Sequence, residues 1–309
     1  MDIALIITEE LKCRKEQVDA AIKLIDEGNT IPFIARYRKE ATGALNDEQL
    51  RNLDERLTYL RNLAEKKETV IASITEQEKM TPELKKAIDE AMTMVALEDL
   101  YRPYRPKRKT RATVAKEKGL QGLADIIMLQ FLDHPLEEEA GKYINAEKEV
   151  LTAEDAIAGA MDIIAENISD NADYRKSIRE RTSARGNLIS TAKDPEAESV
   201  YEMYYDFSSP VSKMTGHRTL AINRGEKEKF LTVKLEAPVD EIIGYLEKQN
   251  IVRDNKYTTD VLKAAIADSY DRLIAPAIER EIRNQLTEEA EDGAIKVFGT
   301  NLKQLLMQP

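Results

Sequence analysis

The chain has 309 residues, enough for about two domains of ordinary size with a core that needs no disulfide or metal to hold it. It carries 46 Lys and Arg against 57 Asp and Glu, a formal net charge of −11, which excludes a uniformly basic coat for nucleic acid. Apolar residues make up 42% of the chain, too many for wholesale disorder.

With one thiol and two imidazole side chains, the sequence predicts neither a metal centre nor a cofactor. Cys13 is the single cysteine, so it forms no intrachain disulfide, and the two histidines are far apart in the sequence. The first residues lack the basic region and long apolar core of a signal peptide, and no stretch approaches the roughly 18 apolar residues of a membrane span. We therefore expect a cytoplasmic protein without membrane contact.

Low glycine and proline contents (12 and 10 residues) favour long helices, and the fold is predicted to be mainly α. Asn46 and Gln49 form a capping box, and leucines at helical spacing follow from Leu50 through Leu63 to Ile74. Other helices are predicted to begin after Thr81 and Thr152. A further helix is predicted from about Asn171 to Gly186, and it carries many arginines.

One interval departs from helical periodicity. Residues 230–235 alternate apolar and polar side chains, which predicts a small β element near 229–236. Helices are predicted to resume at Val239, and Pro276 is expected to kink or break the one that runs to about Asp292. We expect an elongated multi-helix assembly with a helix-turn-helix-like unit at 1–75, a central helical region at 76–205, a small α+β insertion at 206–238 and a helical region at 239–309.

The strongest local charge lies between Tyr101 and Lys118, a segment that contains eight Lys and Arg residues and one acid. This basic strip has a charge of +7 and leaves −18 on the rest of the chain. Pro103 and Pro106 predict an extended backbone here, with a helix capped by Thr113 after it. The candidate phosphate contacts are Arg102, Arg105, Lys107, Arg108, Lys109 and Arg111.

Two questions about the basic strip stay open at the level of sequence. In a strand, Arg105, Lys107, Lys109 and Arg111 would project from one side over roughly 20 Å, whereas a polyproline twist would scatter them. Phosphate contact would give affinity and salt dependence without sequence specificity. Docking of the strip on an acidic surface of the protein's own domains is an equal alternative.

A second candidate follows Gly28, where a helix over about 15–27 ends and Thr30 caps the next one, as in a helix-turn-helix. On a helix, Arg36 and Lys39 share a face with Glu40, while Arg38 points elsewhere. Structural ion pairing is therefore favoured over reading of a DNA groove. His217 and Arg218 form a further candidate contact, although capping or core packing is the simpler role for the histidine.

Four strings in order are specific enough to indicate a family: Ile31–Gly43, Leu97–Tyr101 continuing into Pro106–Thr113, Gly159–Glu166 and His217–Glu226. Together they resemble the N-terminal region of the Tex family of bacterial transcription accessory proteins. Arg102, where an aliphatic residue is expected, and Arg105 depart from the pattern and make the strip more cationic.

The resemblance implies a role in transcription and nucleic-acid binding, and kinship with a eukaryotic elongation factor. It also implies a longer modular protein, in which an RNase H-like domain, helix-hairpin-helix units and an OB-fold RNA-binding domain follow this region and contact it. No enzymatic activity is expected, because neither a nucleotide-binding glycine motif nor a nucleophile pattern occurs.

Two functions remain in competition. The first, which we prefer, is a helical module that binds RNA or DNA weakly and without sequence specificity through the basic strip. The second is a scaffold that organises the other domains, or contacts RNA polymerase, without touching nucleic acid. The scarcity of aromatic residues, 6% of the chain, favours the scaffold, since proteins that bind single strands supply stacking platforms.

Overall fold

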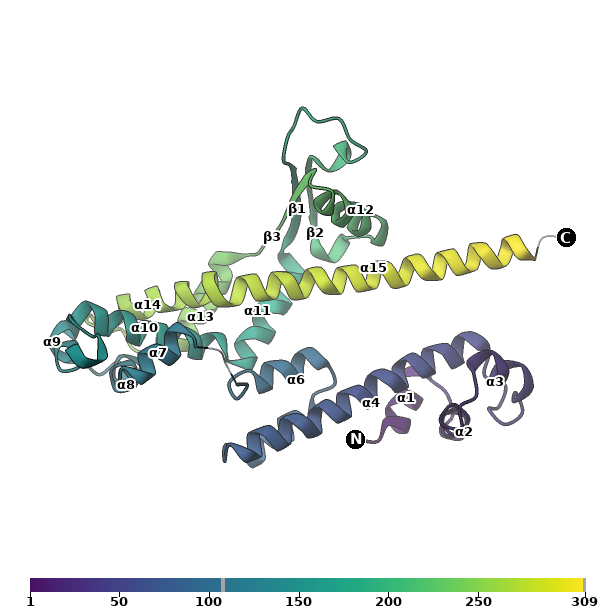
Figure 1. The fold of residues 1–309 in the computed structure, drawn as a ribbon, viewed down its shortest axis with the longest axis horizontal. Helices are drawn as coiled ribbons and strands as arrows, with labels where there is room; N and C mark the ends of the chain where they lie inside the picture. Colours follow the sequence, from purple (N-terminus) through teal and green to yellow (C-terminus); the bar gives the residue numbers. More distant parts are fainter. Residues whose placement is uncertain (107–108, 308–309) are drawn as a thin grey trace. The chain divides into compact units, whose positions relative to one another are not determined.

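The computed structural model describes residues 1–106 and 109–307, and the chain divides into two compact units, Met1–Arg105 and Pro106–Pro309 (Figure 1). The fold is mainly α, as predicted, with one small antiparallel sheet in the second unit. Each unit has a hydrophobic core of its own. None of the described helices is long and apolar enough to cross a membrane.

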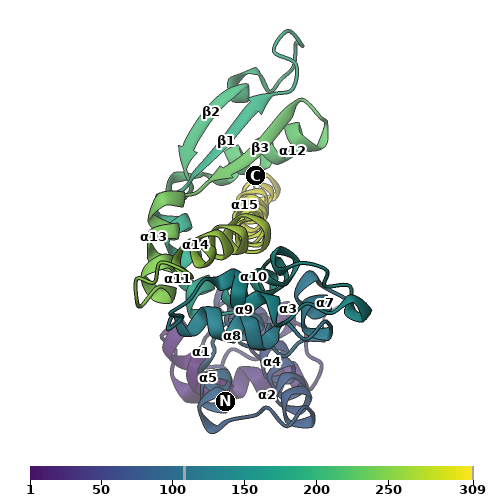
Figure 2. The same ribbon diagram turned by 90° about the vertical axis from the view of Figure 1, so that its left-hand side faces the viewer.

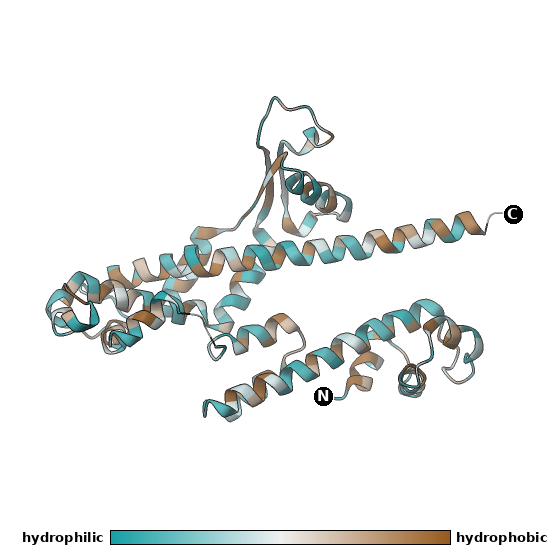
Figure 3. Ribbon diagram, viewed as in Figure 1, coloured by the Kyte–Doolittle hydropathy of each residue, from teal (hydrophilic) through white to brown (hydrophobic). Residues whose placement is uncertain are grey.

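The first unit is built around α4 (Asp47–Glu76), a helix of 30 residues. Asn46 accepts a hydrogen bond from the Gln49 amide, and Gln49 caps the Asn46 amide in return, so the predicted capping box is confirmed. Buried leucines from Leu50 to Leu63 line one face of α4, which alternates hydrophobic and hydrophilic bands in Figure 3. The other helices of the unit are α1 (Ile3–Leu11), α2 (Lys15–Asp26), α3 (Ile31–Tyr37), α5 (Pro82–Glu90) and α6 (Met94–Tyr101).

In the second unit, α10 (Ala153–Ser169) lies at the centre of the helical core. Thr152 caps it as predicted, and its inward face carries small and branched side chains such as Ala156, Ala160 and Ile163. Short side chains let neighbouring helices approach closely on several sides. Around it lie α7 (Arg111–Glu117), α8 (Gln121–Leu129), α9 (Leu136–Gly141), α11 (Ala172–Arg185), α13 (Val239–Asn250) and α14 (Thr259–Asp268).

Of the predicted kink or break at Pro276, the break is wrong. A π-helical segment, Ser269–Ile274, joins α14 to α15 (Ala275–Leu306), and helical backbone runs from Thr259 to Leu306 without interruption. Proline lacks an amide hydrogen and crowds the carbonyl four residues before it in an α-helix. The wider π turn directly before Pro276 accommodates the missing amide hydrogen and the crowding, so the helix continues past Pro276. The helix also runs on to Leu306, so the predicted end near Asp292 is wrong.

The sheet contains β1 (Asn187–Ala192), β2 (Asp206–Pro210) and β3 (Leu231–Glu236) in the order β2-β1-β3, all antiparallel (Figure 2). The predicted element near 229–236 is β3, but the sequence did not indicate β1 and β2 as its partners. Helix α12 (Gly216–Lys227) packs against β3. A Cβ at Gly225 would lie 2.6 Å from Leu231 Cδ1, so this close approach of helix and strand requires glycine.

We expect the first unit to depend on the leucine face of α4. Leu60 is fully buried, and Leu60→Ala should lower the free energy of unfolding by about 2–5 kcal/mol through lost burial and a residual cavity. Urea unfolding followed by circular dichroism measures this change. Leu5→Ala removes the same atoms from a side chain that is 45% exposed and should cost less than about 1 kcal/mol. Equal shifts for the two variants would contradict the assignment of the core.

Candidate nucleic-acid interface

The basic strip begins in a turn and not in an extended segment. Helix α6 ends at Tyr101. The Tyr101 carbonyl accepts hydrogen bonds from the amides of Tyr104 (2.9 Å) and Arg105 (3.0 Å). Arg102 keeps helical angles, φ −50° and ψ −44°, although it precedes Pro103. The usual preference of a residue before proline for extended backbone is thus outweighed by the hydrogen bonds of the helix end. The extended strip expected over 101–118 is therefore wrong at its start.

The strip also ends in a helix. Thr110 is the N-cap of α7, since its Oγ1 accepts from the Thr113 amide at 3.0 Å and the Thr113 hydroxyl caps in return. The cap thus lies three residues before the predicted one, and Arg111 is the first helical residue. A one-sided row from Arg105 to Arg111 on a strand is excluded by the turn and the helix at its two ends. Lys107 and Arg108, also named as contacts, lie outside the described residues.

Two of the candidate phosphate contacts, Arg105 and Lys109, each have an exposed carboxylate neighbour. Arg105 Nη1 lies 3.8 Å from Glu98 Oε2, and Lys109 Nζ lies 3.6 Å from Glu117 Oε2. All four side chains are exposed to solvent, the two cations by about two thirds. Ion pairs of this kind contribute about 0–1 kcal/mol, so a phosphate can replace either carboxylate at little cost. These pairs therefore leave both interpretations of the strip open.

Arg111 differs, because its charge acts on two acids of its own unit. Burial raises the pKa of the Asp162 carboxyl, and the charges of Arg272 and Arg111 oppose that rise. A hydrogen bond from Arg272 lowers the pKa of Asp268, and the charge of Arg111 adds to this effect. Arg111 thus helps to hold these carboxylates ionised where α7, α10 and α14 meet, a role inside the protein itself.

The candidates after Gly28 do not lie on one helical face. Helix α3 begins after Thr30 as predicted but ends at Tyr37, and Arg38 has φ −127°. The Thr42 hydroxyl donates toward the carbonyls of Arg38 and Lys39, while the Lys39 carbonyl accepts from the Ala44 amide at 2.7 Å. These bonds fold residues 38–44 into a loop. The expected sharing of a face by Arg36, Lys39 and Glu40 is wrong, and all three side chains are exposed.

His217 and Arg218 occupy the exposed first turn of α12, so core packing of the histidine is wrong. His217 Nε2 lies 3.4 Å from the hydroxyl of the cap residue Thr215. The Arg218 guanidinium lies 5.9 Å from the centre of the Phe207 ring, a cation–π contact with β2.

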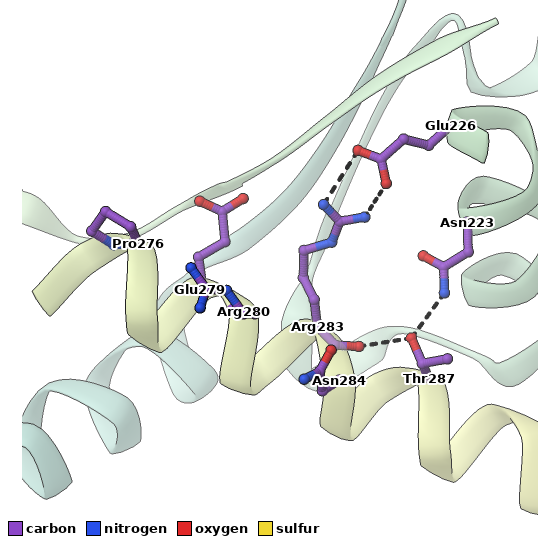
Figure 4. A pocket seen from close by; sticks show the side chains of 8 residues that line it. All are labelled: Asn223, Glu226, Pro276, Glu279, Arg280, Arg283, Asn284 and Thr287. Carbon is purple, nitrogen blue, oxygen red and sulfur yellow. Dashed lines mark hydrogen bonds and ion pairs between the residues drawn. The ribbon is translucent and has the colours of Figure 1, made fainter. Parts of the chain in front are cut away.

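Asn223 and Glu226, which belong to the same His217–Glu226 segment, connect α12 to α15 (Figure 4). Glu226 pairs with Arg283, and the Asn223 amide donates to the Thr287 hydroxyl at 2.8 Å. These residues line an open pocket of about 410 Å³. Sequence reasoning missed this role, because the partners are some sixty residues apart (57 and 64) and no local signal links them.

The second histidine, His134, forms ion pairs with two neighbouring acids. His134 lies in a loop, with Nδ1 2.8 Å from Asp133 and Nε2 3.0 Å from Glu139. The two carboxylates raise the pKa of its imidazole. Within residues 1–106 and 109–307, no three His, Cys, Asp or Glu side chains are placed to share a metal ion.

The placement of Arg111 gives a test by titration. Arg111→Gln removes a positive charge near two carboxylates and should raise the pKa of both Asp162 and Asp268. Carboxyl-carbon NMR across an acid titration measures both values. Lys116→Gln removes an exposed cation from the same helix and should leave them unchanged. If the two variants behave alike, the electrostatic role assigned to Arg111 is wrong.

Comparison with known proteins gives two matches to family models. Residues 1–75 match the Tex-like protein N-terminal domain, and residues 133–298 match the model described as Tex central region-like. The basic strip lies between the two matched regions. The first match covers α1 to α3 and most of α4, and the second runs from α9 into α15.

Similar proteins occur in bacteria and animals. The chain is 49% identical over 306 residues to the uncharacterized protein YdcI of Bacillus subtilis, an alignment that covers 98% of this chain and 43% of that protein. It is 38% identical over 315 residues to the transcriptional accessory protein Tex of Neisseria gonorrhoeae (99% and 41%). It is 33% identical over 323 residues to the S1 RNA-binding domain-containing protein 1 of Pongo abelii (99% and 32%). The chain thus spans about two fifths of the two bacterial relatives and about a third of the third.

Proposed function

Because this chain belongs to the Tex family, we propose that it is a helical module of transcription that binds nucleic acid weakly and without sequence specificity. The proposed role is binding and not catalysis. Within the basic strip, the cations from Arg102 to Lys109 are the proposed contact with the phosphate backbone, since Arg111 acts on acids of its own unit.

The names of two relatives support a role in transcription and in nucleic-acid binding. The protein from Neisseria gonorrhoeae is called a transcriptional accessory protein, and the one from Pongo abelii an S1 RNA-binding domain-containing protein. Both proteins extend well beyond the aligned region. Transfer of either role to this chain is therefore part of the proposal and calls for its own test.

The observation that carries the proposal is the charge of the strip itself. A chain with a net charge of −11 places eight cations and one acid between Tyr101 and Lys118. The described carboxylate neighbours of Arg105 and Lys109 are exposed and weakly held. Each phosphate that takes the place of such a carboxylate releases a counterion from the nucleic acid, which is the main source of non-specific affinity.

Charge reversal in the strip should weaken binding and its dependence on salt together. For the variant Lys107→Glu, Arg108→Glu, Lys109→Glu, the slope of log affinity against log salt on a single-stranded oligonucleotide should become shallower by about 2, at about 0.7 per lost contact. Fluorescence anisotropy of a labelled oligonucleotide from low to moderate salt measures both quantities.

A matched control changes the same charge elsewhere. Lys79→Glu, Lys85→Glu, Lys263→Glu alters three exposed lysines outside the strip and should leave the slope nearly unchanged. Undetectable or salt-independent binding by the unaltered chain would contradict the proposal. That outcome would favour the scaffold function, with RNA polymerase or another protein as partner.

A further inference from the structure

Seven of the eight arginines of the first unit, all except Arg102, fall into two groups. Four have a carboxylate partner within 4 Å: Arg51 with Asp47, Arg56 with Glu10, Arg61 with Asp26 and Arg105 with Glu98. Arg14, Arg36 and Arg38 form no ion pair with any residue that the structure describes. In a chain with excess acid, cations left without a carboxylate need an explanation.

The three arginines belong to neighbouring parts of the unit. Arg36 and Arg38 stand at the end of α3, and the Arg38 guanidinium lies 5.7 Å from the centre of the Phe33 ring. Arg14 belongs to the cap of α2, and its Nη2 would lie only 3.1 Å from a Cβ at Gly43. Arg14 therefore lies against the loop formed by residues 38–44. Lys39 of this loop is a further exposed cation.

Two aromatic rings stand among these cations. Phe33 and Tyr37 are one helical turn apart on α3, their ring centres are 5.2 Å apart, and they are 38% and 63% exposed. Arg36 shares their face, because positions 33, 36 and 37 are neighbours on a helix. The other aromatic residues of this unit, Tyr59, Tyr101 and Tyr104, are all half-buried.

This surface rests on a fixed base. Ile34 and Thr42 are fully buried beneath it. The Gln17 side-chain amide donates to the Gly43 carbonyl at 2.7 Å, which ties the loop to α2. The rings and cations are thus held by packing and hydrogen bonds before any ligand arrives, which lowers the entropic cost of binding.

We propose that Phe33, Tyr37 and the cations Arg14, Arg36, Arg38 and Lys39 form a platform for single-stranded nucleic acid. Bases stack on Tyr37 and Phe33, while the arginines and Lys39 bind the phosphates on either side. This α3 platform deepens the proposed function, on which it rests, by adding a second contact region and a preference for unpaired strands.

A single strand fits the α3 platform better than the alternatives do. Bases within a duplex are already stacked on one another and offer no face to an exposed ring. Helix α3 has only seven residues, and the cations are divided between it and a loop, so no recognition helix lies along a groove. An acidic protein would use the cations but would leave the exposed rings unexplained.

The absence of tryptophan from the chain allows a direct test. Tyr37→Trp keeps an aromatic ring on the α3 platform and makes it the sole indole fluorophore. Single-stranded oligodeoxythymidylate should quench this emission by stacking, at concentrations that match its binding in anisotropy. Polyglutamate should not quench it. Binding without quenching, or quenching by polyglutamate alone, would overturn the proposal.

A second variant separates this proposal from that for the basic strip. Tyr37→Leu should weaken single-strand binding by about fivefold or more and duplex binding much less. Phe131→Leu removes a ring of similar exposure, 66%, from the second unit and should have no such effect. If only charge reversal in the strip weakens binding, the platform is wrong and the proposed function stands. If only Tyr37→Leu weakens binding, the platform proposal stands and the proposed contact at the basic strip is wrong. If the chain binds no oligonucleotide, both proposals are wrong.

Discussion

Glu281 of α15 holds two arginines of α11, and the arrangement of the second unit depends on this contact. Its carboxylate lies 2.6 Å from Arg175, whose side chain is only 1% exposed, and 2.8 Å from Arg179. A buried guanidinium is costly unless an anion compensates it, so α11 has to lie where α15 presents this acid. The sheet follows directly from the end of α11, which places β1 as well.

The same principle explains which basic segments are available to ligands. Helix α11 is among the most arginine-rich stretches of the sequence, yet Arg175 and Arg179 pair with Glu281, while Arg181 and Arg185 pair with Glu241. Arg175, Arg179 and Arg181 are at most one third exposed, so these three arginines stabilise the fold. Arg105 and Lys109 of the basic strip differ, because their carboxylate neighbours are exposed and weakly held. In the α3 platform, Arg14, Arg36 and Arg38 form no ion pair with any residue that the structure describes.

Local chemistry made much of the fold predictable. Caps at Asn46, Thr152 and Asn171 fix where α4, α10 and α11 begin, since the hydrogen bonds involved span three residues. The arrangement of the second unit and the surroundings of Arg111 were harder to predict, because they depend on residues that are distant in the sequence. Arg175 and Glu281 are 106 residues apart, and the strands beside β3 are recognised only once the sheet has assembled. The cationic composition of both candidate regions was visible in the sequence, but the exposed rings on α3 were not.

The central claim is that nucleic acid reaches this chain at the α3 platform and the basic strip and not at its other basic segments. Photo-crosslinking of a single-stranded oligonucleotide containing 5-bromouracil, followed by mass spectrometry of the digested chain, tests it directly. The account predicts crosslinked peptides from residues 31–45 and 101–118. Crosslinks confined to α11 or to the sheet, with both predicted segments unlabelled, would contradict it.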